Sequence, residues 1–228
     1  MKLLKLIAVL LDYPAEELWS HADELRAAID DPALSAQRRV ALLDFVDTLL
    51  ATEPMQAQER WLELFDRGRS MSLLLFEHIH GESRDRGQAM VDLISTYRGH
   101  GFELGVKQLP DYLPVVLEYL SMRPVEEVRD WLSHIVHILE LLAARAQERG
   151  SGYAALLETL VETASGKVDL DLLRKRVATE ERDDTPEAMD RVWEEEAVRF
   201  GNEAPGEECN PPTRLPSGAK RIEPTVTP

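Results

Sequence analysis

Apolar side chains recur at the spacing of an α-helix along most of the first 200 residues. The longest stripe contains Val128, Leu132, Ile135, Leu139 and Leu142, which share one face of a helix. Alternating β-branched runs and Asn-Gly or Asp-Gly hairpin turns do not occur in the sequence. The pattern predicts an all-α protein, a helical bundle of roughly nine to eleven helices joined by short loops.

Helix start and stop signals agree with this periodicity. Ser35 and Thr185 stand where N-caps belong, and Pro186 follows Thr185 at the favoured first helical position. Pro124 precedes the longest stripe, and Gly150 follows it at a position typical of a helix end. We therefore expect the longest helix to lie between these two residues.

The composition changes after Phe200. Residues 201–228 are rich in Pro, Gly and Glu and contain few apolar side chains. Such a segment cannot bury enough surface to offset the entropy lost on ordering. We predict a helical domain at residues 1–200 and a disordered tail at residues 201–228.

The charge and cysteine content limit the environment and the partners. A formal net charge of −16 disfavours binding to nucleic acid or to an anionic membrane surface. The apolar residues 2–11 are interrupted by Lys5 and followed by Asp12, so we predict a buried first helix, and no apolar run reaches the ~20 residues of a membrane span. The single cysteine, Cys209, cannot form an internal disulfide and fits a cytoplasmic protein without direct membrane insertion.

A metal site is the strongest catalytic candidate in the sequence. His78, His80 and Glu82 are ligand types, and a metal-dependent hydrolase that uses the two histidines is one alternative function. On a helix, however, the two histidines lie about 200° apart and face opposite ways. Ser83 is not in a nucleophile elbow, because no strand leads into it. We predict neither a metal site nor catalytic residues.

Residues 63–90 mix apolar side chains with charges of both signs within a few positions, and glycines interrupt them. Ordinary helix faces keep these classes apart. Two interpretations fit the segment. One is a buried hydrophobic hairpin with salt bridges around its turn, and the other is a groove with apolar walls and a polar rim that accepts an amphipathic helix.

Three blocks of sequence, residues 63–90, 109–120 and 182–196, together with Leu-Asp-Tyr-Pro at residues 11–14, resemble the NarJ-type chaperones of respiratory nitrate reductase. These chaperones form one branch of the TorD/DmsD group of molybdoenzyme chaperones. The blocks keep the family's order, and the third block separates the nitrate reductase branch from the wider group. Trp61 stands where the family has Tyr, and Tyr112 where it has His. Both substitutions keep a flat amphipathic ring.

The resemblance implies a single-domain helical bundle of TorD type that is not an enzyme. It implies binding to the N-terminal segment of the apo nitrate reductase catalytic subunit, which then receives the molybdenum guanine dinucleotide cofactor and an iron–sulfur cluster. The chaperone itself holds no permanent cofactor, and the proteins that deliver the molybdenum cofactor are further candidate partners. A chaperone for a dimethyl sulfoxide or trimethylamine N-oxide reductase and a helical adaptor for an unrelated basic partner stay open as alternatives.

We predict a set of client-binding side chains on this interpretation. The apolar walls and acidic rim of the groove, with three neighbouring residues of the same blocks, are Leu64, Phe65, Asp66, Leu75, Phe76, His78, Glu82, Asp111, Tyr112, Leu113, Pro114, Leu117, Glu118 and Tyr119. The residues expected to organise the loop are Arg67, Gly81, Ser83, Arg84 and Arg86. Because a helical apolar stripe is usually core, we expect some of the wall residues to be buried.

Overall fold

A computed structural model describes residues 1–31, 34–81, 83–105, 107–165, 170–191 and 194. The chain divides into two compact units, Met1–Met189 and Asp190–Pro228. The first unit contains all the helices named below. The predicted boundary at Phe200 and the predicted tail at residues 201–228 lie outside the described residues and stay predictions.

Within the described part of the chain, the secondary structure consists of eleven named α-helices, one 3-10 helix, a further helical stretch at residues 186–191 and a single isolated bridge between Leu74 and Tyr112. The predicted all-α class is therefore confirmed. The helices are α1 (Lys2–Leu11), α2 (Glu17–Ser20), α3 (Ala22–Ala28), α4 (Ala36–Ala51), α5 (Pro54–Phe65), η1 (Arg69–Met71), α6 (Leu75–His80), α7 (Asp85–Gly99), α8 (Leu113–Ser121), α9 (Val125–Glu148), α10 (Ala154–Ser165) and α11 (Asp171–Val177).

Local sequence signals explain several helix ends. The Ser35 hydroxyl accepts the Arg38 N–H at 3.3 Å and caps α4, as predicted. Pro124 precedes α9, and Gly150 follows it with a φ of 64°, a backbone angle that favours glycine. Helical backbone also resumes after Thr185, whose hydroxyl accepts the N–H of Ala188 at 3.2 Å. The predicted caps at Ser35 and Thr185 are confirmed. They could be predicted because each bond joins residues only three positions apart in the chain.

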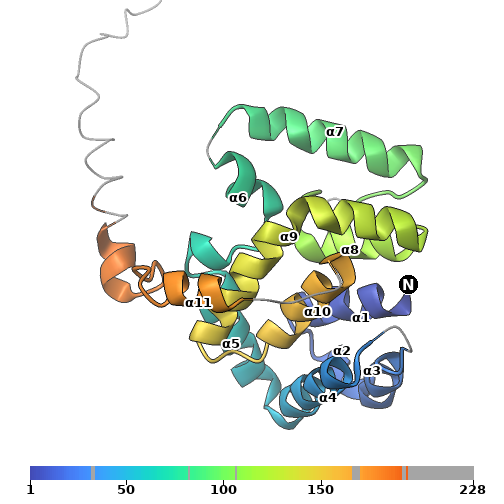
Figure 1. Ribbon diagram of the computed structural model, residues 1–228, viewed down its shortest axis with the longest axis horizontal. Helices are drawn as coiled ribbons and strands as arrows, with labels where there is room; N and C mark the ends of the chain where they lie inside the picture. Colours follow the sequence, from blue (N-terminus) through green and yellow to red (C-terminus); the bar gives the residue numbers. More distant parts are fainter. Residues whose placement is uncertain (32–33, 82, 106, 166–169, 192–193, 195–228) are drawn as a thin grey trace, which may run out of the picture. The chain divides into compact units, whose positions relative to one another are not determined.

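The core of the first unit is built around the long helix α9 and its partner α10. These two helices pack along each other, and α1 packs against α8 (Figure 1). The predicted stripe of α9 is buried, and seven of the ten residues of α1 are buried as well, so the expected buried first helix is confirmed. Among the described helices, none combines the length and apolarity that crossing a membrane requires.

One stretch departs from its predicted form. The apolar spacing of Leu18, Ala22, Leu25 and Ile29 predicts a single helix, but the structure divides it into α2 and α3. The division occurs at His21, whose φ of −107° and ψ of 23° lie outside the helical range.

A buried cation connects α4 to α10. Arg38 contacts the carboxylates of Glu158 and of Glu162, the second at 3.1 Å, and only 9% of the Arg38 side chain is exposed. The two acidic residues are one turn apart on α10, so a single guanidinium bridges both. The ion pairs fix the spacing between two helices that, as described below, both line a groove.

Candidate functional site

Most apolar side chains predicted as groove walls lie in the core. The buried group consists of Leu64, Phe65, Leu75, Leu113, Pro114, Leu117 and Tyr119. Leu113 and Leu117, each with an exposed fraction of 0%, cannot contact a partner in this conformation. The binding role of these residues therefore stays a prediction, while their packing role is directly visible.

Asp111, predicted for the acidic rim, is an interior residue that holds the start of α6. Its exposed fraction is 0%, and its carboxylate accepts the N–H of Phe76 at 3.1 Å. Its backbone carbonyl accepts the N–H of Leu75 at 3.0 Å, and the guanidinium of Arg86 lies 4.0 Å from the carboxylate. Burial raises the pKa of Asp111, and the Phe76 N–H and Arg86 oppose this rise only in part.

The histidines of the metal hypothesis have other partners. Nε2 of His78 lies 2.8 Å from the carbonyl oxygen of Ser72, to which it donates, and the ring of His80 packs edge-on against Phe76. Glu82 lies outside the described residues. Among the residues that are described, no three His, Cys, Asp or Glu side chains form a group that could hold a metal ion.

The turn between α6 and α7 contains three of the predicted loop residues. Gly81 ends α6 with a φ of 54°, which favours glycine. The Ser83 hydroxyl accepts the N–H of Asp85 at 3.2 Å and so helps to start α7, while Arg84 is exposed. These contacts are local to the turn.

The two other predicted loop arginines form ion pairs with nearby carboxylates. Arg86 lies 3.4 Å from Glu77 on α6, and Arg67 lies 3.3 Å from Glu63 one turn earlier. Asp66, which precedes Arg67, is exposed. Arg86 therefore connects α7 to α6, whereas the exposed pair at Arg67 contributes little to stability.

Three predicted residues, Tyr112, Pro114 and Glu118, line a depression of about 340 Å³ between α1 and α8. The Tyr112 hydroxyl donates to the carboxylate of Asp12 at 2.9 Å, so the Leu-Asp-Tyr-Pro block contacts the second block here. Val9 of α1 is 41% exposed beside it. The depression is small compared with a second hollow on the same unit.

That second hollow is a groove of about 970 Å³ between α4, α5, the start of α10 and residues 182–186. Its floor contains the largely buried side chains Phe45, Leu49, Ala57, Leu64, Tyr153 and Ala154. The ring of Tyr153 packs edge-on against Phe45 at 4.9 Å and Phe65 at 5.1 Å between centroids, which fixes its position. Gly152 keeps this floor open, because a Cβ there would meet the Phe45 ring at 3.1 Å.

The rim of the groove carries charges of both signs. Asp44 on α4 contributes a carboxylate, and Arg60 on α5 and Arg67, which follows the end of α5, contribute guanidinium groups. Arg182 adds a further cation from residues 182–186. An apolar floor with a mixed polar rim is the arrangement that accepts an amphipathic helix.

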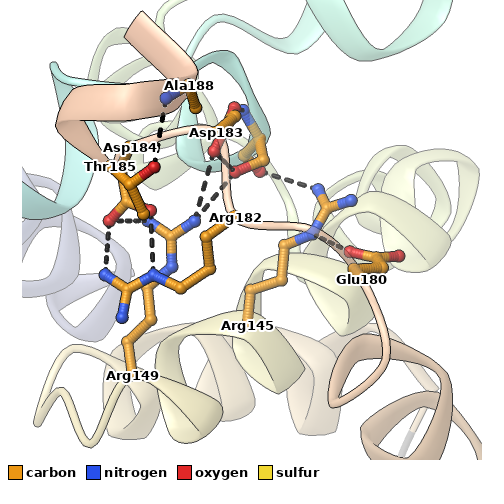
Figure 2. Close-up of polar contacts among 9 residues, drawn as sticks. Arg145, Arg149, Glu180, Arg182, Asp183, Asp184, Thr185 and Ala188 are labelled. Atoms are coloured by element: carbon orange, nitrogen blue, oxygen red, sulfur yellow. Dashed lines mark hydrogen bonds and ion pairs between the residues drawn. The ribbon is translucent and has the colours of Figure 1, made fainter.

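Residues 182–186, here called the groove wall, are held by a polar network around Asp183 (Figure 2). The Asp183 carboxylate accepts the N–H of Ser70 at 2.7 Å and also its hydroxyl, and Arg149 lies 3.4 Å away. Arg149 contacts Asp184 at 3.3 Å, and Arg182 donates two hydrogen bonds to the same carboxylate. The first and third sequence blocks thus meet at this network.

The network lowers the pKa of both aspartates. Burial alone would raise the pKa of Asp183, but the hydrogen bonds from Ser70 and the charge of Arg149 bring it below its ordinary value. The hydrogen bonds from Arg182 lower the pKa of Asp184, against the effect of burial. Both carboxylates are therefore charged at neutral pH.

A family model described as nitrate reductase delta subunit matches residues 16–164. The chain belongs to this family. The match runs from α2 into the last turn of α10, so it includes three sides of the groove but not the groove wall. The resemblance drawn from the three sequence blocks is confirmed at the level of the family.

The chain is also similar to individual proteins. It is 48% identical over 198 residues to the nitrate reductase molybdenum cofactor assembly chaperone NarJ of Escherichia coli (strain K12), covering 86% of this chain and 84% of that protein. It is 45% identical over 202 residues to the "Probable nitrate reductase molybdenum cofactor assembly chaperone NarW" of the same strain, covering 88% and 84%. The similarity thus extends over most of each chain.

Of the residues on the floor and wall of the groove, the sequence-based prediction of client-binding side chains included only Leu64. Phe45 and Tyr153 belong to stripes that also pack the core, and Arg149 sits at a helix end where a cation is ordinary. The one available signal was Gly68, a glycine inside the charged first block. The structure shows that Asp183 occupies the space in which a side chain at this position would lie.

Proposed function

We propose that this protein is an assembly chaperone for a respiratory nitrate reductase. It binds the N-terminal segment of the apo catalytic subunit and keeps that subunit competent to receive its molybdenum cofactor and iron–sulfur cluster. The carrying observation is the similarity over 86% of the chain to a protein named for this role. The names of both relatives favour nitrate reductase over a dimethyl sulfoxide or trimethylamine N-oxide reductase as the client.

The groove between α4, α5 and α10 is the site that best fits such a client segment. A volume of about 970 Å³ is at the upper end of the range for binding pockets and suits several side chains of a short helix. Apolar client residues would lie on the floor beside Phe45 and Leu49, and a client cation would face Asp44 across the rim. The smaller depression at Tyr112 and Glu118 is the second candidate surface.

Release follows from the modest size of this interface. A groove that binds only a short client segment gives up that segment when client folding supplies better contacts for the same side chains. The chaperone needs no bound cofactor for this cycle, because cofactor and cluster belong to the client. The cytoplasm, where cofactor insertion precedes assembly at the membrane, is the proposed place of action.

Calorimetric titration of the full chain with a synthetic peptide of the client N-terminus tests the proposal. Saturable binding of this peptide, and none of a scrambled peptide, is the expected result. Failure of the folded protein to bind either peptide would refute the proposed recognition.

Three tryptophan substitutions locate the site. Thr48→Trp places a bulky ring in the large groove and should abolish binding, whereas Val9→Trp places one in the depression between α1 and α8. Thr96→Trp, at an exposed position of α7, is the matched control and should bind as wild type. Loss of binding in Val9→Trp alone would move the site to α1 and α8.

A further inference from the structure

The groove wall lacks regular secondary structure and depends on side chains for its position. Residues 182–185 have no helical hydrogen-bond pattern, and helical backbone resumes only at residue 186. Four of the groove-lining residues, Arg182, Asp184, Thr185 and Pro186, come from this short segment. The contacts that hold the segment therefore decide whether this side of the groove exists.

Asp183 makes the contacts that reach the segment before α6. Its carboxylate accepts the backbone N–H of Ser70 at 2.7 Å and the Ser70 hydroxyl, across 113 positions of sequence. Arg149 of the α9–α10 turn donates to Ser70 Oγ at 2.9 Å and lies 3.4 Å from Asp183. Hydrogen bonds that involve a charged partner are stronger than neutral ones, and here three donors converge on one carboxylate.

Arg145 provides a second connection to Ser70. Arg145 donates to the carbonyl oxygen of Ser70 at 2.7 Å and to Glu180 at 2.9 Å (Figure 2). Only 16% of the Arg145 side chain is exposed, so water weakens these bonds less than at the open surface. Ser70 is thus the common attachment point for both arginines and for Asp183.

Gly68 leaves the space that the Asp183 carboxylate occupies. A Cβ at Gly68 would lie 2.5 Å from Asp183 Oδ1 and 2.7 Å from its Cγ, distances that real contacts do not show. The φ of Gly68 is −138°, which any residue adopts, so the requirement for glycine here is steric only. An alanine at position 68 would displace the carboxylate from Ser70 without changing any charge.

We infer that Asp183 is a positioning residue for the groove: by binding Ser70 it holds residues 182–186 as the fourth side, and a bound client segment in turn keeps that side closed. The inference rests on the proposed function. If the client binds only when the wall is in place, its apparent affinity is proportional to the fraction of molecules with the wall closed. By the same linkage, the client raises that fraction.

The test measures the affinity of the client N-terminal peptide for full-length Asp183→Ala, Gly68→Ala and the double variant. Each single change should weaken binding about tenfold, as expected if the closed fraction falls to roughly one tenth. The double variant should bind no more weakly than Asp183→Ala, because the group that clashes with the new methyl is gone. Gly87→Ala, whose Cβ would meet nothing within 4 Å, is the matched control and should bind as wild type.

Trypsin provides a readout that a purely stabilising role would not change. Arg182 lies in the wall with 58% of its side chain exposed, and cleavage after it reports opening of the wall. We expect faster cleavage there in Gly68→Ala, which leaves the residues around the cut bond unchanged, than in wild type, and slower cleavage of wild type when the peptide is bound.

The outcomes separate this inference from the proposed function. If wild type binds the peptide and both folded single variants bind it equally well, the positioning role of Asp183 is wrong and the proposed function stands. If wild type does not bind the peptide, the proposed function and this inference fail together. Circular dichroism of each variant shows that a loss of binding is not a loss of fold.

Discussion

Replacing Leu117 by alanine shows whether this residue belongs to the core or contacts the client. Leu117 lies in the middle of α8 with an exposed fraction of 0%. Truncating a fully buried leucine removes its packing contacts and leaves a cavity, which costs about 3 kcal/mol in typical cores. For a protein of this size that cost corresponds to a melting temperature lower by about 6–12 °C.

Urea unfolding followed by circular dichroism measures this loss, with Glu118→Ala as the control. Glu118 is the next residue and is exposed, so its replacement should change the free energy of unfolding by no more than about 0.5 kcal/mol. If Leu117→Ala kept the unfolding free energy of wild type but weakened binding of the client peptide, Leu117 would be an accessible client-binding residue. The argument that it is buried would then be refuted.

Three further outcomes are expected. The lowered pKa values of Asp183 and Asp184 mean that their contribution to stability is complete above about pH 4 and is lost as pH falls through those lowered values. Urea midpoints measured between pH 7 and pH 3 should therefore fall less steeply at the acid end in Asp183→Asn than in wild type; equal slopes would contradict this. Arg38→Met should cost about 3 kcal/mol in urea unfolding, because it leaves buried carboxylates without their cation. Adding Glu158→Leu should recover part of that loss, and no recovery would argue against the ion pair. Tyr97→Phe removes a buried hydroxyl that donates to a backbone carbonyl at 2.8 Å, so thermal unfolding should show a loss of about 1–2 kcal/mol; an unchanged melting temperature would contradict that bond.

Local features of this fold could be predicted from the sequence because their causes lie within one or two helical turns. The stripe that includes Leu132 and Leu139 gives α9, and Ser35 caps α4 through a residue only three positions away. The blocks that resemble the family also pointed to the right family. Each of these inferences requires only the chain near the residues concerned, or a pattern shared with relatives.

The candidate site could not be predicted in the same way. Helical spacing identifies which side chains leave solvent, but it does not say whether helices or a partner cover them, so Leu117 fits a core and a wall equally well. A carboxylate is ordinarily expected at the surface. Only the three-dimensional structure shows that Asp111 is buried and that its carboxylate has the Phe76 N–H and Arg86 as partners. The bond between Ser70 and Asp183 joins positions 113 residues apart, beyond the range of any periodicity.

This long separation between Ser70 and Asp183 also sets an order of events during synthesis. A ribosome adds residues 182–186 after α4, α5 and α10, and domains begin to fold while the chain is still growing. Three sides of the groove are therefore synthesised before the fourth. A nascent chaperone that has folded its core but lacks Asp183 would have an open, apolar groove without the side that completes it. The newly made protein should thus become able to hold its client only after residues 182–186 have been made and have bound Ser70.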